Sequence, residues 1–454
     1  MVLAGVAVIA AVAFYATSSS LVFDERAALV ILLVAAGLWT TEAVPLAATS
    51  ILIPLLQSLL GVQSFSEALR PFFDPIVMLL LGGFLLAVAV GKYDLDEFFA
   101  YQIVSRVKAD ARIVVLVIML TTAFLSMWIS NTASTALMLT IALRLTEGVR
   151  DGKGNFSKVV VLGIAYSSTA GGLATLVGTT TCAMAAGFLK DLVGYEVTFL
   201  GWSLFGLPIT LLMIAAIWLI LFVVFPTDVE RILDVGLEPK KLDRRQRLTL
   251  AVFVAAILLW LTGSLPEPLT VALGWSGHGM SSSVVAAVIA VLLFFSGLLD
   301  ERDLPRANWN TLVLIGGGLS LGAALEVSGL TLRISRALLQ FTQGVPEVVT
   351  ILIVAYASLG VSVIASNTAS AGIFLPIAIG LGITAGISPV VLAVTVGITT
   401  SLDFMLPVGT PPNAIAYSTG KVEMRDMIKA GIILDVVGGL ITVALAYLLW
   451  PHLI

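Results

Sequence analysis

The chain has 454 residues, of which 59% are hydrophobic and only 11% are charged. Soluble domains carry about 25% charged residues, so this chain lacks the charged surface that a soluble protein of its size needs. The composition predicts an integral membrane protein that binds no nucleic acid. Cys182 is the only cysteine, which excludes an intrachain disulfide and any site built from several cysteines.

Eleven apolar runs are long enough to cross the roughly 30 Å hydrocarbon core of a bilayer. They are residues 1–17, 26–40, 44–60, 75–91, 158–189, 200–225, 246–264, 281–299, 309–327, 388–419 and 427–450. Two further apolar regions, 112–145 and 347–385, are too long for one helix and have polar residues at their middle. Each is predicted to be a re-entrant hairpin of two half-helices. The predicted fold is therefore an all-α polytopic membrane protein.

The positions of Lys and Arg predict the orientation of the chain, because cytoplasmic loops carry an excess of both. If the basic 226–246 loop is cytoplasmic, alternation places all but five of the 24 basic residues on that side. We then expect a cell (inner or plasma) membrane protein with a cytoplasmic N-terminus and an external C-terminus. Segments 94–108 and 329–340 are amphipathic and are predicted to be interfacial helices, with plain loops as the alternative.

Three short motifs recur in the two halves of the chain. Residues 80–83 resemble 314–317, the Ser-Asn-Thr-Ala-Ser sequence of 130–134 returns at 366–370, and the Val-Gly-Thr sequence of 177–179 returns at 408–410. The offsets are 234, 236 and 231 residues. Each half holds five spans and one hairpin, so the second copy is predicted to be inverted. Inverted repeats are common in secondary transporters, which bind their substrate and ions at the repeat interface.

These motifs predict four helix breaks, two at the Ser-Asn-Thr tips and two at the Val-Gly-Thr segments. Freed amides at a helix start suit a carboxylate, and freed carbonyls with Ser and Asn oxygens suit a hard cation such as Na⁺. Pro411 and Pro412 are expected to force a membrane helix open. No Lys or Arg lies near a break, which favours cation-coupled anion transport. In the alternative interpretation, these side chains only satisfy backbone groups and pack helices.

Together with residues 39–45 and 404–413, the motifs resemble the divalent anion/sodium symporter family, which includes dicarboxylate, citrate and sulfate transporters. The resemblance spans almost the whole chain. It implies a homodimer with an elevator mechanism, in which a transport domain carrying both hairpins slides against a scaffold domain. The implied scaffold parts are residues 1–111 and 226–340, each with an interfacial helix, and the implied transport parts are residues 112–225 and 341–454, each with one hairpin.

The resemblance also implies which residues bind the ions and the substrate. Two sodium sites are implied, one using Ser126, Ser130, Asn131 and Gly178, the other Ser362, Ala365, Asn367 and Gly409. The substrate carboxylates would be held by Ser130, Asn131, Thr132, Ser366, Asn367 and Thr368, with Thr179 and Thr410 at the rim. No organic cofactor is expected.

Four residues raise separate questions. Thr180 and Thr181 stand where the family commonly has Pro or Gly followed by Pro. Asp403 and Asp435 lie in the tenth and eleventh spans, where ionisable groups are costly and are candidates for function. Either carboxylate could couple transport by relaying a proton or binding a cation. The alternative is that each pairs helices or faces water.

The leading hypothesis is a sodium-coupled symporter of C4-dicarboxylates such as succinate, malate or fumarate. A sodium-independent exchanger of dicarboxylates such as 2-oxoglutarate and malate is the alternative, and sulfate or a tricarboxylate is an alternative substrate. A channel is disfavoured because the two hairpins enter from opposite sides and leave no continuous pore. An enzyme is not expected, since no nucleophile–base pair or multi-histidine cluster stands out.

Overall fold

The computed structural model describes residues 2–18, 20–104, 109–147, 154–227, 229, 231–232, 241–342 and 344–453. These residues are overwhelmingly helical. One short antiparallel pairing, between β1 (Ala109–Asp110) and β2 (Arg231–Ile232), is an addition to the all-α prediction. Most of the basic 226–246 loop, and residues 105–108 of the first predicted interfacial helix, lie outside the described residues.

Helices form over all eleven apolar runs, and the fifth and tenth runs each contain two. The helices are α1 (Val2–Ala16), α2 (Phe23–Thr41), α3 (Leu46–Leu59), α5 (Pro75–Lys92), α9 (Asn155–Gly172) with α10 (Thr180–Val193), α11 (Phe199–Val224), α12 (Arg244–Leu261), α14 (Ser282–Phe295), α15 (Trp309–Val327), α19 (Pro389–Thr399) with α20 (Pro411–Ser418), and α21 (Met424–Leu448). The structure thus divides the chain close to where its apolar pattern does.

Both predicted hairpin regions consist of two helices around a short break. α7 (Ala111–Ser126) and α8 (Asn131–Glu147) form the first pair, and α17 (Glu347–Ser362) and α18 (Asn367–Ala385) the second. Their arms have 16 to 19 residues, close to the roughly 20 residues that a full span needs. The two helices of each pair cover the predicted apolar region on either side of its polar middle, and whether they enter and leave on the same side of the membrane stays a prediction.

The remaining helices are short or amphipathic. α6 (Leu95–Val104) and α16 (Leu330–Thr342) occupy the two segments predicted to be interfacial helices rather than loops. Two small α-helices and three 3₁₀ turns complete the described part: α4 (Phe65–Leu69), α13 (Glu267–Leu273), η1 (Arg70–Phe73), η2 (Leu304–Arg306) and η3 (Trp450–His452). α16 packs along α18, so this helix contacts the segment that follows it in the chain.

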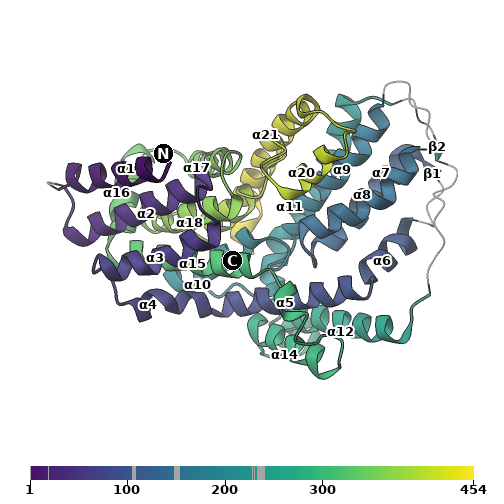
Figure 1. Ribbon diagram of the computed structural model, residues 1–454, viewed down its shortest axis with the longest axis horizontal. Coiled ribbons are helices and arrows are strands. Elements are labelled where there is room, and N and C mark those ends of the chain that lie inside the picture. Colours follow the sequence, from purple (N-terminus) through teal and green to yellow (C-terminus); the bar gives the residue numbers. More distant parts are fainter. Residues whose placement is uncertain are drawn as a thin grey trace.

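The packing of helices follows the same plan in both halves. α9 lies against α7, α8 and α11, and α19 lies against α17, α18 and α21. The short helices after the breaks cross over: α10 packs on α18, and α20 packs on α8. In Figure 1, α1 to α3 and α16 lie at one end of the molecule, α7 and α8 near the other, and α5, α12 and α14 along the lower edge. Each break is therefore held by helices from both halves.

Apolar side chains cover much of the outer surface. In the described residues, five helices are long and apolar enough by themselves to cross a membrane, namely α5, α11, α15, α18 and α21. Large side chains such as Phe73, Val223 and Phe295 are 90%, 79% and 88% exposed. Apolar exposure on this scale marks a surface that faces lipid or another protein.

Candidate functional site

The first hairpin tip places a serine against an asparagine. α7 ends at Ser126, whose hydroxyl donates to the side-chain oxygen of Asn131, the first residue of α8, at 2.6 Å. Ser126 is fully buried. Between them, the hydroxyl of Ser130 accepts from the Ala133 amide at 3.2 Å and so caps α8. A hydroxyl that donates in this way still offers its oxygen lone pairs to a cation.

The break between α9 and α10 closes around this tip. Gly172 ends α9, and a Cβ added to it would lie 2.6 Å from Asn131 Oδ1 and 3.1 Å from the Gly178 carbonyl oxygen. The Thr175 hydroxyl donates to the Met127 carbonyl at 2.6 Å and accepts from the Gly178 amide at 3.1 Å. The lack of a side chain at Gly172 thus brings two oxygens around one point. The Asn131 amide nitrogen also lies 3.1 Å from this point, and the two oxygens are ligands of the kind that a hard cation prefers.

The second tip repeats the first. α17 ends at Ser362, whose hydroxyl donates to the side-chain oxygen of Asn367, the first residue of α18, at 2.9 Å. The same hydroxyl lies 2.5 Å from the Thr400 carbonyl at the end of α19. Ser366 precedes α18, but its side chain makes no capping hydrogen bond. The first amides of α18 therefore have no side-chain cap and suit an anion.

The second break is wider than predicted, and its prolines act differently. Residues 400–410 lie outside both α19 and α20. Pro411 and Pro412 occupy the first two positions of α20, where a missing amide costs little because first-turn amides have no partner within the helix. The expectation that these prolines open the interior of a helix was therefore wrong. They start a helix, and Thr410 caps it by accepting from the Asn413 amide at 3.3 Å.

The width of this break changes the setting of Asp403. It lies in the non-helical segment rather than within a helix of the tenth span, and it is fully buried. Gly409 faces it so closely that a Cβ at this position would overlap the carboxylate. Asp435 lies in α21, as predicted, and accepts a hydrogen bond from the Phe404 amide at 2.9 Å. The two candidate coupling carboxylates thus flank one segment of chain.

Hydroxyl groups link the breaks of one half to those of the other. Thr180 Oγ1 lies 2.6 Å from Thr368 Oγ1. Ser401 Oγ lies 3.2 Å from Thr179 Oγ1 and 2.7 Å from Thr181 Oγ1. The two threonines that replace the family's usual Pro-Pro or Gly-Pro pair therefore bind the opposite half of the chain.

All four breaks line one cavity of about 810 Å³. Two predicted cation residues, Ser126 and Ser362, are not in its lining and are fully buried. The two candidate coupling residues, Asp403 and Asp435, are not in its lining either. The remaining residues predicted to bind ions or substrate all line it: Ser130, Asn131, Thr132, Gly178, Thr179, Ala365, Ser366, Asn367, Thr368, Gly409 and Thr410. Among the described residues of this lining there is no Lys or Arg. The structure therefore brings the predicted ion- and substrate-binding residues together around a cavity without basic side chains, while their binding of ions or substrate stays a prediction.

Sequence reasoning missed the residue at the centre of the first tip's hydrogen bonds. The Ser168 hydroxyl donates to the Asn131 carbonyl at 2.8 Å and contacts Ser126 and Ser134 at 3.2 and 2.9 Å. Thr399 in α19 contacts Ser358 of α17 at 2.8 Å. The sequence does mark both residues, because Ser-Thr at 168–169 corresponds to Thr-Thr at 399–400 at nearly the repeat offset.

Part of the cavity wall comes from the region predicted to be the scaffold. Thr40, Thr41 and Glu42 line it from the end of α2, and Asn308 and Thr311 from the start of α15. Glu42 is the one ionisable side chain among the described lining residues. It holds a left-handed φ of 47°, which residues other than glycine seldom adopt. The motif at 39–45 could have identified Thr40, Thr41 and Glu42, whereas no motif marks Asn308 or Thr311.

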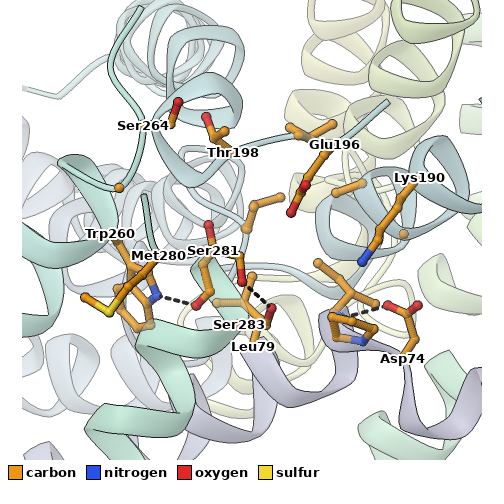
Figure 2. Close-up of a pocket in the computed structure, with 18 of the residues that line it drawn as sticks. Asp74, Leu79, Lys190, Glu196, Thr198, Trp260, Ser264, Met280, Ser281 and Ser283 are labelled. Atoms are coloured by element: carbon orange, nitrogen blue, oxygen red, sulfur yellow. Dashed lines mark hydrogen bonds between the residues drawn. The ribbon is translucent and has the colours of Figure 1, made fainter. Parts of the chain in front are cut away.

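A second cavity, of about 450 Å³, contains none of the predicted site residues. Figure 2 shows Asp74, Lys190 and Glu196 on one side of it and Trp260 and Ser281 on the other. Trp260 is fixed there by a hydrogen bond from its indole to the carbonyl of residue 282, at 3.0 Å. Its walls carry charges of both signs, unlike those of the cavity at the breaks.

Comparison with known families and relatives gives a consistent result. The chain matches the sodium:sulfate symporter transmembrane region over residues 1–454. It is 33% identical to an uncharacterized transporter of Haemophilus influenzae, over 97% of this chain and 95% of that protein. It is 31% identical to the sodium-dependent dicarboxylate transporter SdcS of Staphylococcus saprophyticus, over 91% of this chain and 84% of that protein.

Solved structures resemble the fold. The YdaH transporter of Alcanivorax borkumensis superposes with a TM-score of 0.60 at 18% identity, covering 84% of this chain and 87% of that one. MtrF of Neisseria gonorrhoeae gives a TM-score of 0.55 at 14% identity, covering 86% of this chain and 83% of that one. At these identities the likeness concerns the fold alone.

Proposed function

This chain belongs to the sodium:sulfate symporter family and is a membrane transporter rather than an enzyme, and we propose that it moves C4-dicarboxylates such as succinate, malate or fumarate together with Na⁺. Relatives named as sodium-dependent dicarboxylate transporters align over most of the chain, which supports both the substrate class and the ion.

The observation that carries this proposal is the pair of serine–asparagine contacts beside one cavity whose described lining has no basic side chain. Ser126 with Asn131, and Ser362 with Asn367, present oxygen atoms of the kind that bind Na⁺. No Lys or Arg lines the cavity among its described residues. A dicarboxylate would therefore rely on the positive ends of α8 and α18 and on co-bound cations. Under this proposal, cation and anion binding depend on each other.

We propose that the two halves form an inverted repeat with one re-entrant hairpin each. The common packing plan of α9 and α19, and the crossing of α10 onto α18 and α20 onto α8, support this arrangement. Residues 112–225 and 341–454 would form a transport domain that moves as an elevator against residues 1–111 and 226–340. The cavity wall at Thr40, Thr41 and Asn308 would then be the part left behind as the transport domain moves. The proposed assembly is a homodimer with a cytoplasmic N-terminus and an external C-terminus.

Uptake into proteoliposomes tests this proposal. With an inward sodium gradient, vesicles containing the purified protein should concentrate labelled succinate, and replacing Na⁺ by choline should stop the accumulation. Labelled sulfate and citrate, tested in parallel, separate the substrate classes of the family. A current that persists without any coupling ion would instead indicate a channel.

A sodium-independent exchanger is the second candidate, and Thr180 is the observation in its favour. This residue replaces the family's usual proline or glycine and contacts Thr368 in the opposite half, so the first break differs from the common pattern. Uptake that ignores the sodium gradient but requires dicarboxylate inside the vesicle would establish exchange and contradict symport.

A further inference from the structure

Asp403 has a carboxylate with no partner in a fully buried position. Its exposed fraction is 0%, and within the described part of the chain neither carboxylate oxygen accepts a hydrogen bond or pairs with a cation. A buried, unpaired carboxylate is among the most costly groups that a fold can hold. Some group must therefore offset this charge when the protein works.

Two neighbouring oxygens are also without partners. The Asn413 amide nitrogen donates to the carbonyls of Asp403 and Leu406 at 3.1 and 3.0 Å, which fixes the orientation of this side chain and leaves Oδ1 without a donor. The Tyr166 ring packs edge-on against Phe404 at 5.2 Å, and its hydroxyl is buried without a partner. Asn413 and Tyr166 are both 0% exposed. Asp403, Asn413 and Tyr166 thus each have side-chain oxygen atoms without a hydrogen-bond partner. They come from the segment between α19 and α20, from α20 and from α9.

A second carboxylate adds to the negative charge there. Asp435, 6% exposed, accepts from the Phe404 amide at 2.9 Å. Asp435 and Asp403 both lie within electrostatic range of the Tyr166 hydroxyl. Among the described residues neither carboxylate forms an ion pair with Lys, Arg or His. Either a proton or a bound cation must therefore neutralise this charge, because the nearby side chains supply no positive group.

This group of oxygens lies next to the cavity. Gly409 lines the cavity and faces the Asp403 carboxylate. The carboxylate has room there only because glycine has no Cβ. The described residues contain no cluster of three His, Cys, Asp or Glu side chains that could hold a metal. Carboxylate, amide and hydroxyl oxygens without sulfur or imidazole suit a hard cation rather than a transition metal.

We propose that Asp403, Asn413 and Tyr166 bind an additional Na⁺, separate from the two ions at the serine–asparagine pairs. This site rests on the proposed sodium coupling and deepens it. The ion would enter from the cavity beside Gly409 and would neutralise Asp403. Sodium would then stabilise the protein without substrate, and the size of this effect would depend on the carboxylate.

Thermal unfolding of purified protein in detergent, titrated with NaCl at constant ionic strength in choline chloride, tests the site without any dicarboxylate. In sodium-free buffer, Asp403→Asn should melt at a higher temperature than the unmodified protein, because the substitution removes a buried charge. On adding Na⁺ the unmodified protein should gain more than the variant, whose half-saturating sodium concentration should rise about tenfold. Asp24→Asn, an exposed change in α2, is the matched control.

Tyr166→Phe provides a second variant, since it removes only a hydroxyl that has no hydrogen-bond partner. It should fold normally and raise the half-saturating sodium concentration by roughly threefold. Identical sodium titrations for Asp403→Asn and the unmodified protein would overturn the additional site while leaving the two predicted sites in place. A protein that shows no sodium response at all would overturn both this site and the proposed coupling.

Discussion

The hydroxyl oxygen of Thr180 lies 2.6 Å from that of Thr368. Thr180 opens α10 in the first half of the chain, and Thr368 is the second residue of α18 in the second half. The proline or glycine that the family resemblance implies at position 180 has no hydroxyl and could not make this contact. The departure from the family's pattern therefore creates a direct link between the two breaks.

We predict that this link contributes measurably to stability. Thr180→Val and Thr368→Val should each lower the free energy of unfolding by about 0.5–1.5 kcal/mol, the usual net value of one hydrogen bond. Because both changes remove the same interaction, the double variant should lose less than the sum of the two. Thermal unfolding of the four proteins measures this coupling. Strictly additive losses would show that the hydroxyls do not interact.

Thr140→Val is the matched control for these variants. The Thr140 hydroxyl is exposed and bonds to the Ala136 carbonyl within its own helix at 2.9 Å. This change should leave both the melting temperature and the sodium response of the protein close to their original values.

The glycine cradle at the first break gives a second prediction. Gly172→Ala would place a Cβ 2.6 Å from Asn131 Oδ1, so we expect sodium-dependent stabilisation to weaken at least about tenfold in half-saturating concentration. Gly91→Ala is the control, because a Cβ at that helical position meets no atom within 4 Å. Gly91→Ala should raise the free energy of unfolding slightly, by about 0.5–1 kcal/mol, because alanine favours the helix more than glycine does. An unchanged sodium titration in Gly172→Ala would contradict the predicted first cation site.

The two asparagines provide the test of the paired sites. Asn131→Ala and Asn367→Ala each remove an oxygen that faces a predicted cation, and such charged contacts contribute about 1.5–3 kcal/mol. Succinate uptake should therefore fall at least about tenfold in each variant, while size-exclusion chromatography shows normal assembly. Asn155→Ala, which removes an exposed hydrogen bond to the Pro226 carbonyl, should transport normally. Near-normal uptake in either site variant would count against the assignment.

An ion pair outside the spans gives a prediction on pH. Asp303, in the loop between α14 and α15, lies 2.5 Å from Lys92. Burial alone would raise the pKa of Asp303, but hydrogen bonds from Lys92, the Asp300 amide and Arg306 outweigh it and hold the pKa below its ordinary value. A lowered pKa stabilises the folded state above the unfolded-state pKa, and this contribution is lost as the pH falls through the folded-state pKa.

Asp303→Asn should accordingly lower the melting temperature at pH 7, and the difference from the unmodified protein should shrink as the pH falls below about 4, where the unfolded-state carboxyl protonates. Asp300→Asn, in the same loop, is a weaker change, since that carboxylate lies 4.0 Å from Lys92 and is 62% exposed. A melting difference that stays constant between pH 7 and pH 3 would show that Asp303 acts through packing rather than charge.

The elements of the fold were largely predictable because each depends on local composition. An apolar run of 18 or so residues forms a helix wherever it lies, and the polar tips at 130 and 366 interrupt their helices where the sequence does. The width of the second break was not predictable. The non-helical segment is held by tertiary contacts that no local pattern reveals, such as the hydrogen bond from the Phe404 amide to Asp435 of α21.

The site was predictable only where a motif repeats. The family resemblance grouped Ser126 with Asn131 and Ser362 with Asn367, the repeat offset supported this grouping, and the structure places both pairs in contact. Asn308 and Thr311 line the same cavity but belong to no repeated motif. Tertiary packing alone brings the start of α15 to the cavity. The role of Pro411 was mistaken because the rule for a proline depends on whether a helix continues or begins there.

The central claim is that an anion binds in this cavity, whose described lining has no Lys or Arg, only with the help of cations. Thermal unfolding of the purified protein with succinate, malate, fumarate, sulfate and citrate, in NaCl and in choline chloride, tests it most directly, since a ligand that binds the folded state raises its stability. We predict that the C4-dicarboxylates raise the melting temperature in sodium and leave it unchanged in choline. Equal shifts with succinate in the two salts would contradict the claim.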